Sequence, residues 1–369
     1  MTKTIRIGID GSIFSEQPRG HSLYTYRLCE QLGAQLPEAQ FFVYSPWPVD
    51  LSGFKGDWTL QTGSKRSRLS PVLWLKTVAG KMCQADRLDL FWSPYVFLPR
   101  LGRETKTLIT VYDFVNQITP DSFARLHSLA YTLFARSDIR QADTIVTISQ
   151  GTNDKLLQYF GRRSLVVKPA LEPRYRRPDS SEIQATLNAL NIRQPYLLNV
   201  ATWDPRKNVA TLVRAFLEMK TAGEIPHQLI LVGKKDRAVE EIQHLIANQE
   251  QQNIIALGYL DDQYLPSLYA GADAFVFPSI YEGFGMPVLE ARACGTQVVT
   301  TDIPELREAG DDNCIYVQPT ESGIRQGILC ALSRNGRDDP GPSAPSWSDQ
   351  AGLLAAEMRR LIGAQNSYT

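Results

Sequence analysis

Two glutamates eight residues apart, Glu282 and Glu290, frame a glycine turn with the features of an anion-binding site. The apolar run of residues 274–277 precedes them and predicts a buried parallel strand, and a helix with Pro287 in its first turn follows. In the Gly-x-Gly turn at residues 283–285, small residues let the backbone approach a ligand, and N–H groups at the helix start face that ligand. Carboxylates beside such a turn suit sugar or ribose hydroxyls. The stretch therefore predicts a nucleotide-sugar site.

A basic pair, Arg206 and Lys207, lies between a predicted strand at residues 196–200 and a predicted helix that runs through Phe216. Arginine offers a planar fork to two oxygens and lysine a compact charge, so the pair suits a diphosphate. Exposed basic pairs are also common in solvated loops, and Gly-x-Gly after a strand is common in α/β proteins. These spacings alone leave both interpretations open.

The full string from Phe277 to Thr296 closely resembles the Glu-x7-Glu signature of retaining glycosyltransferases of family 4. Residues 199–208 resemble the family element that grips the donor diphosphate, with Ala201 in place of the usual glycine. The resemblance spans essentially the whole chain. It implies an α/β GT-B fold, in which two doubly wound Rossmann-like domains face each other across a cleft. The implied reaction moves a hexose from a nucleotide diphosphate to an acceptor hydroxyl, retains the anomeric configuration and requires no metal.

The resemblance also implies roles for individual residues. Glu290 would bind the nucleotide ribose and Glu282 the transferred sugar, while Arg206 and Lys207 would neutralise the leaving diphosphate. The last three are catalytic candidates. Other residues match donor-binding positions of the family, and they are Phe284, Gly285, Met286, Gly258, Tyr259 and Gly20.

The chain departs from the family pattern at several positions. The predicted strand at residues 107–111 resembles a family strand that ends in His-Asp, but here the two residues are Tyr112 and Asp113. Both are catalytic candidates, although a phenol is a poorer acid–base group than imidazole near neutral pH. The family's first Gly-x-Gly loop is represented here by Gly20 and Ser22.

These departures keep a second class of function open, that of a catalytically idle nucleotide-sugar binder. An epimerase of similar fold is a further alternative. It is disfavoured because the first predicted strand, residues 5–10, is not followed by Gly-x-Gly-x-x-Gly and a later acidic residue.

The length of 369 residues exceeds the size at which one core usually keeps growing, and so predicts two domains. The proline-rich stretch at residues 168–179 predicts a linker. We therefore expect an acceptor-side domain at residues 1–170 and a nucleotide-sugar domain at residues 171–349. A last helix, at about residues 350–369, should pack back onto the first domain.

The formal net charge is zero, but residues 1–170 hold 21 Lys and Arg against 14 Asp and Glu, and the remainder holds 18 against 25. This asymmetry fits an anionic acceptor or membrane surface, and equally two solvated surfaces that attract each other. Lys65, Arg66 and Arg68 precede an amphipathic segment that contains Trp74, a pattern typical of peripheral membrane contact. A helix packed on the sheet is the favoured alternative for that segment.

Five scattered cysteines without Cys-x-x-Cys spacing favour reduced thiols, and neither a signal peptide nor a membrane span is predicted. We expect a cytoplasmic enzyme, with peripheral contact at the inner face of the membrane as an open alternative. The donor would be GDP-mannose or UDP-glucose, and no residue decides between them. The expected acceptor is a glycan or lipid-linked oligosaccharide of a bacterial surface polysaccharide. Neither a cofactor nor a metal nor a nucleic-acid partner is expected.

Overall fold

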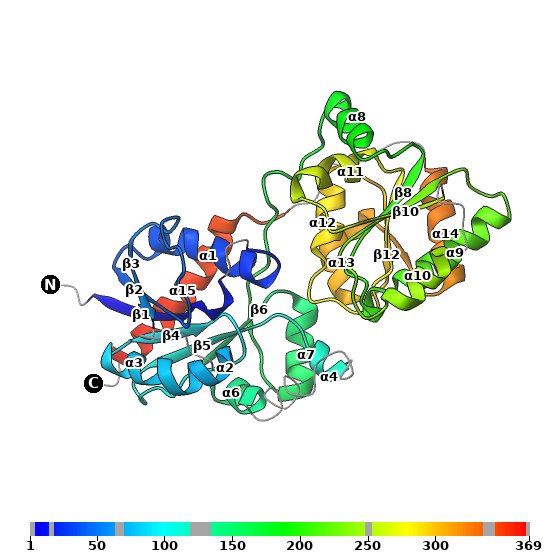
Figure 1. Cartoon of the computed structure of the whole chain (residues 1–369). Coiled ribbons are helices and arrows are strands. Elements are labelled where there is room, and N and C mark those ends of the chain that lie inside the picture. The colour runs from blue at the N-terminus through cyan, green and yellow to red at the C-terminus, as the bar shows by residue number, and fades with distance from the viewer. Residues whose placement is uncertain are drawn as a thin grey trace. The chain divides into compact units, whose positions relative to one another are not determined.

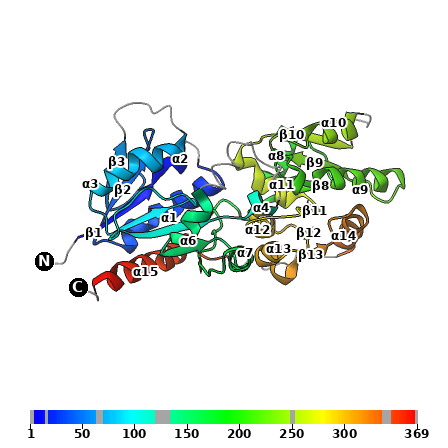
Figure 2. The same ribbon diagram turned by 90° about the horizontal axis from the view of Figure 1, so that it is seen from below.

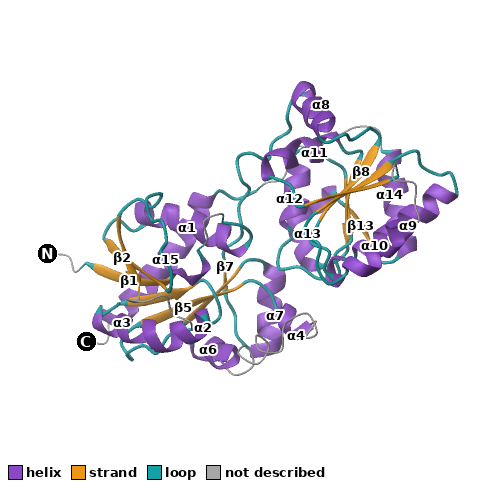
Figure 3. Ribbon diagram, in the orientation of Figure 1, coloured by secondary structure: helices purple, strands orange, loops and turns teal. Residues whose placement is uncertain are grey.

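The computed structural model describes residues 4–14, 18–62, 70–118, 134–247, 253–334 and 344–366. The chain divides into two compact units (Figure 1). Unit 1 comprises Met1–Ala170 together with Pro345–Thr369, and unit 2 comprises Leu171–Ala344. Each unit has a parallel sheet with helices packed on it (Figure 3).

The sheet of unit 1 has the strand order β3-β2-β1-β4-β5-β6-β7, and all neighbours pair in parallel. Its strands are β1 (Ile5–Asp10), β2 (Ala39–Ser45), β3 (Asp57–Thr62), β4 (Leu90–Ser93), β5 (Lys106–Val111), β6 (Thr144–Thr147) and β7 (Leu165–Val166). The sequence analysis missed β3 and β7. Both are edge strands without fully buried residues, so they lack the apolar run that marks the central strands.

Helices connect these strands, and the last helix of the chain returns to unit 1. The described helices are α1 (His21–Gln35), α2 (Pro71–Trp74), α3 (Gly80–Ala85), α4 (Val115–Ile118), α6 (Arg136–Gln141), α7 (Gln150–Phe160) and α15 (Trp347–Asn366). Helix α15 packs along α1 (Figures 1 and 2). Arg359 of α15 donates hydrogen bonds to Glu38 Oε1 and to the Gln35 carbonyl, each over 2.7 Å. The helical spacing of apolar residues at 124–140 predicts a further helix, most of which lies outside the described residues.

The segment with the amphipathic pattern is helical from Pro71 to Ala85, with a π-helical stretch at Leu75–Ala79 between α2 and α3. Trp74 and Leu75 are buried in the core beneath the sheet, in one cluster with Phe91 and Ile139. Trp74 therefore packs within the domain and does not present its indole at the surface. The basic residues 65–68 lie outside the described residues.

The sheet of unit 2 has the order β10-β9-β8-β11-β12-β13, again parallel throughout. Its strands are β8 (Tyr196–Val200), β9 (Gln228–Val232), β10 (Ile254–Gly258), β11 (Ala274–Phe277), β12 (Val298–Thr301) and β13 (Ile315–Val317). Its described helices are α8 (Ser180–Ala189), α9 (Val209–Thr221), α10 (Val239–Ala247), α11 (Leu265–Gly271), α12 (Met286–Ala293), α13 (Pro304–Gly310) and α14 (Glu321–Ser333). No described helix is long and apolar enough to cross a bilayer.

Both sheets have a point at which the strand order reverses. In unit 1 the reversal brings β4 beside β1, and in unit 2 it brings β11 beside β8. Loops leave such a pair toward opposite faces, so a crevice opens outside the carboxyl ends of the two strands, where open α/β sheets bind ligands. The loops after β8 and β11 carry Arg206, Lys207 and Glu282, so the topology brings together residues about 75 positions apart.

Replacing Trp74 tests whether this residue belongs to the core. We expect Trp74→Ala to lower the free energy of unfolding by about 3–5 kcal/mol, because a large buried side chain is lost and a cavity remains. The matched control is Leu73→Ala, since the neighbouring side chain is 44% exposed and should change stability by about 0.5 kcal/mol or less. Urea unfolding followed by circular dichroism measures both. Equal stabilities for the two variants would contradict the buried position.

Candidate active site

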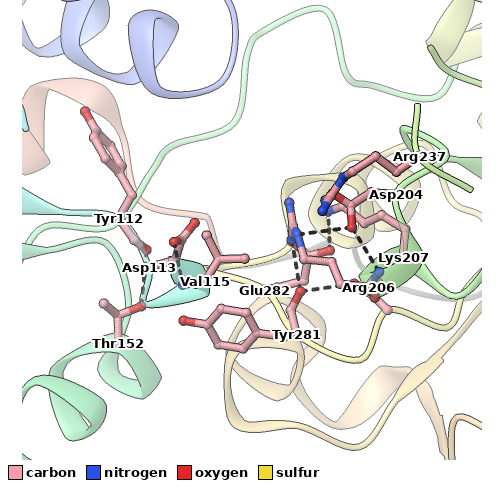
Figure 4. Close-up of polar contacts among 11 residues, drawn as sticks. Tyr112, Asp113, Val115, Thr152, Asp204, Arg206, Lys207, Arg237, Tyr281 and Glu282 are labelled. Atoms are coloured by element: carbon pink, nitrogen blue, oxygen red, sulfur yellow. Dashed lines mark hydrogen bonds and ion pairs between the residues drawn. The ribbon is translucent and has the colours of Figure 1, made fainter. Parts of the chain in front are cut away.

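A buried carboxylate between two cations forms the centre of the site in unit 2 (Figure 4). Glu282 is 7% exposed, and its Oε2 lies 3.4 Å from Arg206 Nη1. Its Oε1 accepts a short hydrogen bond from Lys207 Nζ. Burial lowers the pKa of the Lys207 ammonium, and the charge of Glu282 opposes that effect. A charge withdrawn from water needs such a partner, so each of these side chains fixes the position of the others.

Hydrogen bonds to backbone carbonyls also connect the two loops. The Ile280 N–H donates to the Arg206 carbonyl over 2.8 Å, and Ser279 Oγ donates to the same carbonyl over 3.1 Å. In return, Arg206 Nη1 donates to the Tyr281 carbonyl over 3.1 Å. The loop after β8 and the loop after β11 therefore form one rigid element, and the cations lie on a fixed support.

Two residues that the sequence analysis did not single out complete this cluster. Asp204 Oδ1 accepts from the Arg206 N–H over 2.9 Å and caps the short 3-10 turn Pro205–Lys207. Asp204 Oδ2 pairs with Arg237 Nη2 at 2.5 Å. An aspartate two residues before an arginine is a recognisable cap pattern, so Asp204 had a local signal. Arg237 had none, because its partner lies 33 positions away.

The glycine turn before α12 has the backbone shape that the motif predicts. Gly285 has φ of 108° and precedes the helix, and a Cβ at this position would come within 2.5 Å of Leu306 Cδ2. Only glycine fits both the left-handed conformation and the close approach. Phe284 is buried beneath the turn, and Met286 is the first residue of α12. Gly285 provides no side-chain cap, so the N-terminal end of α12 is a candidate anion site.

Glu290 lies one turn into α12, beside two tyrosines. Tyr269 Oη donates to Glu290 Oε2 over 3.0 Å, and the ring of Tyr175 meets that of Tyr269 edge to face. Desolvation raises the pKa of Glu290 to about 7, and the hydrogen bond from Tyr269 opposes the rise. This carboxyl group therefore changes charge near neutral pH.

The predicted base-side residues lie at the end of β10. Gly258 has φ of 69°, and its carbonyl accepts from the Gly233 N–H at the end of β9 over 2.7 Å. Tyr259 is 47% exposed, and the ammonium of Lys234 lies 5.6 Å from the centre of its ring. An aromatic side chain and a cation thus stand at the ends of adjacent strands.

The candidates of unit 1 lie at the carboxyl edge of its own sheet. Tyr112 is buried, and its hydroxyl shares a 3.0 Å hydrogen bond with Thr25 Oγ1. Asp113 Oδ1 accepts from the Val115 N–H over 3.0 Å at the start of α4. Gly20 has φ of 51° and stands at the N-cap of α1. Figure 4 shows Tyr112 and Asp113 with their contacts in unit 1.

The chain matches known proteins in sequence and in structure. Residues 194–334 match the model of the family Glycosyl transferases group 1. The O-antigen chain mannosyltransferase B of Escherichia coli is 27% identical, over 76% of this chain and 72% of its own. The O-antigen chain mannosyltransferase RfbU of Salmonella typhimurium is 26% identical, over 72% of each chain.

Solved structures of known glycosyltransferases share the fold of this chain. WaaG, a glycosyltransferase involved in lipopolysaccharide biosynthesis, superposes with a TM-score of 0.68 at 14% identity, over 98% of this chain and 99% of its own. Anabaena HepE in complex with UDP-glucose has a TM-score of 0.64 at 16% identity, over 99% of each chain. The fold is thus that of the GT-B glycosyltransferases, as predicted. In sequence, residues 194–334 are similar to the group 1 glycosyl transferases.

The raised pKa of Glu290 makes stability depend on pH with a known sign. The carboxyl group binds its proton more tightly in the folded state, so protonation favours folding. As pH rises from about 4.5 to about 7, the wild type should lose stability relative to Glu290→Gln. The measurement is the difference between the two unfolding free energies across that pH range, which cancels the titration of other groups. A constant difference would contradict the assigned environment.

Proposed function

We propose that the protein transfers a hexose from a nucleotide-diphosphate sugar to a hydroxyl of a glycan, with retention of the anomeric configuration. The observation that carries the proposal is the ion-paired cluster of Glu282, Arg206 and Lys207. It lies at the switch point of the unit 2 sheet, where parallel sheets bind ligands. Carboxylate and cations together suit a ligand that has both hydroxyl groups and phosphates.

The charge of the cluster suits a departing nucleoside diphosphate. Three cations, Arg206, Lys207 and Arg237, face two carboxylates, Asp204 and Glu282, so the formal charge is +1 before a ligand binds. When the anomeric C–O bond breaks, the diphosphate gains negative charge, and fixed cations stabilise it without reorganisation. The amides at the N-terminal end of α12, around Phe284, Gly285 and Met286, add to this effect. We propose that these groups serve in place of a metal.

We propose that each of the two glutamates binds hydroxyl groups of a different part of the donor. Glu282, which is already fixed by both cations, is placed to accept from a hydroxyl of the transferred sugar. Glu290 would accept from the ribose, and Tyr269 orients its carboxylate. Gly258 and Tyr259 would border the nucleobase. In unit 1, we propose that Asp113 and the buried Tyr112 support the acceptor side.

The relatives guide the choice of donor and acceptor. Two of the relatives are named O-antigen chain mannosyltransferases, so GDP-mannose is the donor that we favour. UDP-glucose, the ligand of the HepE structure, is the alternative donor. The proposed acceptor is a glycan or lipid-linked oligosaccharide. We also propose a cytoplasmic enzyme, and the excess of basic residues in 1–170 would attract it to an anionic membrane surface.

A nucleotide binding series tests the donor site. At one hundred times its dissociation constant, GDP or UDP should stabilise the protein by about 2.7 kcal/mol, and ADP should not. Arg206→Ala and Lys207→Ala should weaken binding at least tenfold, because each removes a charge-assisted hydrogen bond of roughly 1.5–3 kcal/mol. Arg325→Ala is the matched control, since this exposed arginine of α14 pairs with Glu224. The measurement is the shift in melting temperature with nucleotide concentration, for the wild type and for each variant. Undiminished binding in Arg206→Ala and Lys207→Ala would overturn the assignment.

The stereochemistry and the role of metals require a second experiment. From an α-linked donor sugar we expect an α-linked product, as read from the one-bond C–H coupling in NMR. Excess EDTA should change the rate by less than about twofold, because the cations of the site take the role of a metal. The control is the same reaction with Mg²⁺ restored. A β-linked product would refute retention, and loss of activity in EDTA would refute metal independence.

A further inference from the structure

A group of aromatic side chains lies at the carboxyl edge of the unit 1 sheet, at its own switch point. His21 begins the helix that follows β1, Tyr95 follows β4, and Tyr112 follows β5. The imidazole of His21 stacks on the phenol ring of Tyr112, with centroids 3.9 Å apart and planes 9° from parallel. These residues come from three strand ends that the strand order places side by side.

Tyr112 forms the buried wall of this group. Its hydroxyl is hydrogen-bonded to Thr25 and lies 3.4 Å from the His21 carbonyl, and Tyr24 packs edge-on against its ring. Burial raises the pKa of Tyr112 well above its ordinary value, so the phenol keeps its proton. The imidazole of His21 covers this ring and is itself exposed to solvent. The group that meets a ligand here is thus His21 and not Tyr112.

Tyr95 completes a corner with His21. Its ring lies 6.1 Å from that of His21 with an angle of 82° between the planes, and 5.9 Å from Tyr112 with an angle of 73°. The side chain is 37% exposed, so part of the ring reaches solvent. The exposed imidazole of His21 and the partly exposed ring of Tyr95 thus stand nearly at right angles, so that a ligand could stack on one ring and contact the other.

Carboxylates accompany the aromatic corner. Asp10 ends β1 and Asp113 follows β5. The Asp113 side chain is partly exposed, whereas Asp10 is buried and its Oδ1 accepts from the Ser12 N–H over 2.9 Å. Partial burial raises the pKa of Tyr95, and the charges of Asp10 and Asp113 add to the rise. Carboxylates accept hydrogen bonds from hydroxyl groups and repel phosphates. A neutral sugar ring therefore suits this edge better than a diphosphate.

We propose that His21 and Tyr95 form the subsite for a neutral pyranose ring of the acceptor. The C–H face of the sugar would stack on the aromatic surface, and its hydroxyls would reach the imidazole and Asp113. This inference rests on the proposed glycosyl transfer, and it assigns acceptor recognition to two residues outside the motifs of unit 2. Tyr112 acts as a positioning residue, since its ring fixes the plane of the imidazole.

Steady-state kinetics with the full chain test the subsite. The donor is GDP-mannose or UDP-glucose, whichever the nucleotide series selects, and methyl α-D-mannopyranoside is the acceptor probe. Tyr95→Ala and His21→Ala should each raise the acceptor KM about tenfold, with the donor KM unchanged, because a stacking surface is lost. Tyr95→Phe keeps the ring and should retain a nearly normal acceptor KM. The control is Tyr159→Ala, which removes a tyrosine of α7 that is 40% exposed.

A direct binding measurement separates this inference from the proposed function. Saturation-transfer NMR detects methyl α-D-mannopyranoside on the protein without any donor, and thermal unfolding verifies that each variant is folded. Loss of the signal in Tyr95→Ala but not in Tyr159→Ala supports the subsite, even if no donor is turned over. A wild-type acceptor KM in folded Tyr95→Ala and His21→Ala overturns it. The proposed function would stand in that case if Arg206→Ala still weakens donor binding at least tenfold.

Discussion

The pairing of the buried Glu282 carboxylate with Arg206 and Lys207 is the interaction on which the proposed donor site depends. A charge removed from water is tolerated only beside an opposite charge or several hydrogen bonds, so these three side chains cannot adopt independent positions. Since they come from the loops after β8 and β11, the pairing also fixes the two loops to each other. The hydrogen bonds from Ile280 and Ser279 to the Arg206 carbonyl make the same connection through the backbone.

The two units have the same type of parallel sheet, but different side chains lie at the point where the strand order reverses. In each, a reversal of strand order opens a crevice at the carboxyl edge of a parallel sheet. In unit 2 that edge has arginine and lysine around two carboxylates, which suits a phosphate-bearing sugar. In unit 1 it has the stacked rings of His21 and Tyr112, with the partly exposed Asp113 next to Tyr112 in the chain, which suits a neutral sugar. This contrast is what the proposed transfer from a charged donor to an uncharged hydroxyl would need.

Local pattern and actual environment differ most clearly at two aromatic residues. The pattern around Trp74 is typical of a membrane-surface helix, yet the indole packs in the core of unit 1. Tyr112 stands where the family resemblance implies a histidine, and its hydroxyl is satisfied by Thr25 within the protein. In both cases a large aromatic ring is buried where the local sequence pattern predicts an exposed or catalytic side chain. Removing so much apolar surface from water lowers the free energy of the folded state, which favours the buried position.

The sequence by itself determined the strand–turn–helix around Glu282 and Glu290 and the basic pair at residues 206–207, and its resemblance to a known family implied the class of fold. The strand–turn–helix rests on local patterns: an apolar run, a glycine that must adopt positive φ, and a proline in the first helical turn. Only the tertiary structure decided which distant side chains meet. Arg237 reaches Asp204, Tyr269 reaches Glu290, and His21 covers Tyr112. Such contacts depend on strand order and on the burial of charge, which no single stretch of sequence encodes.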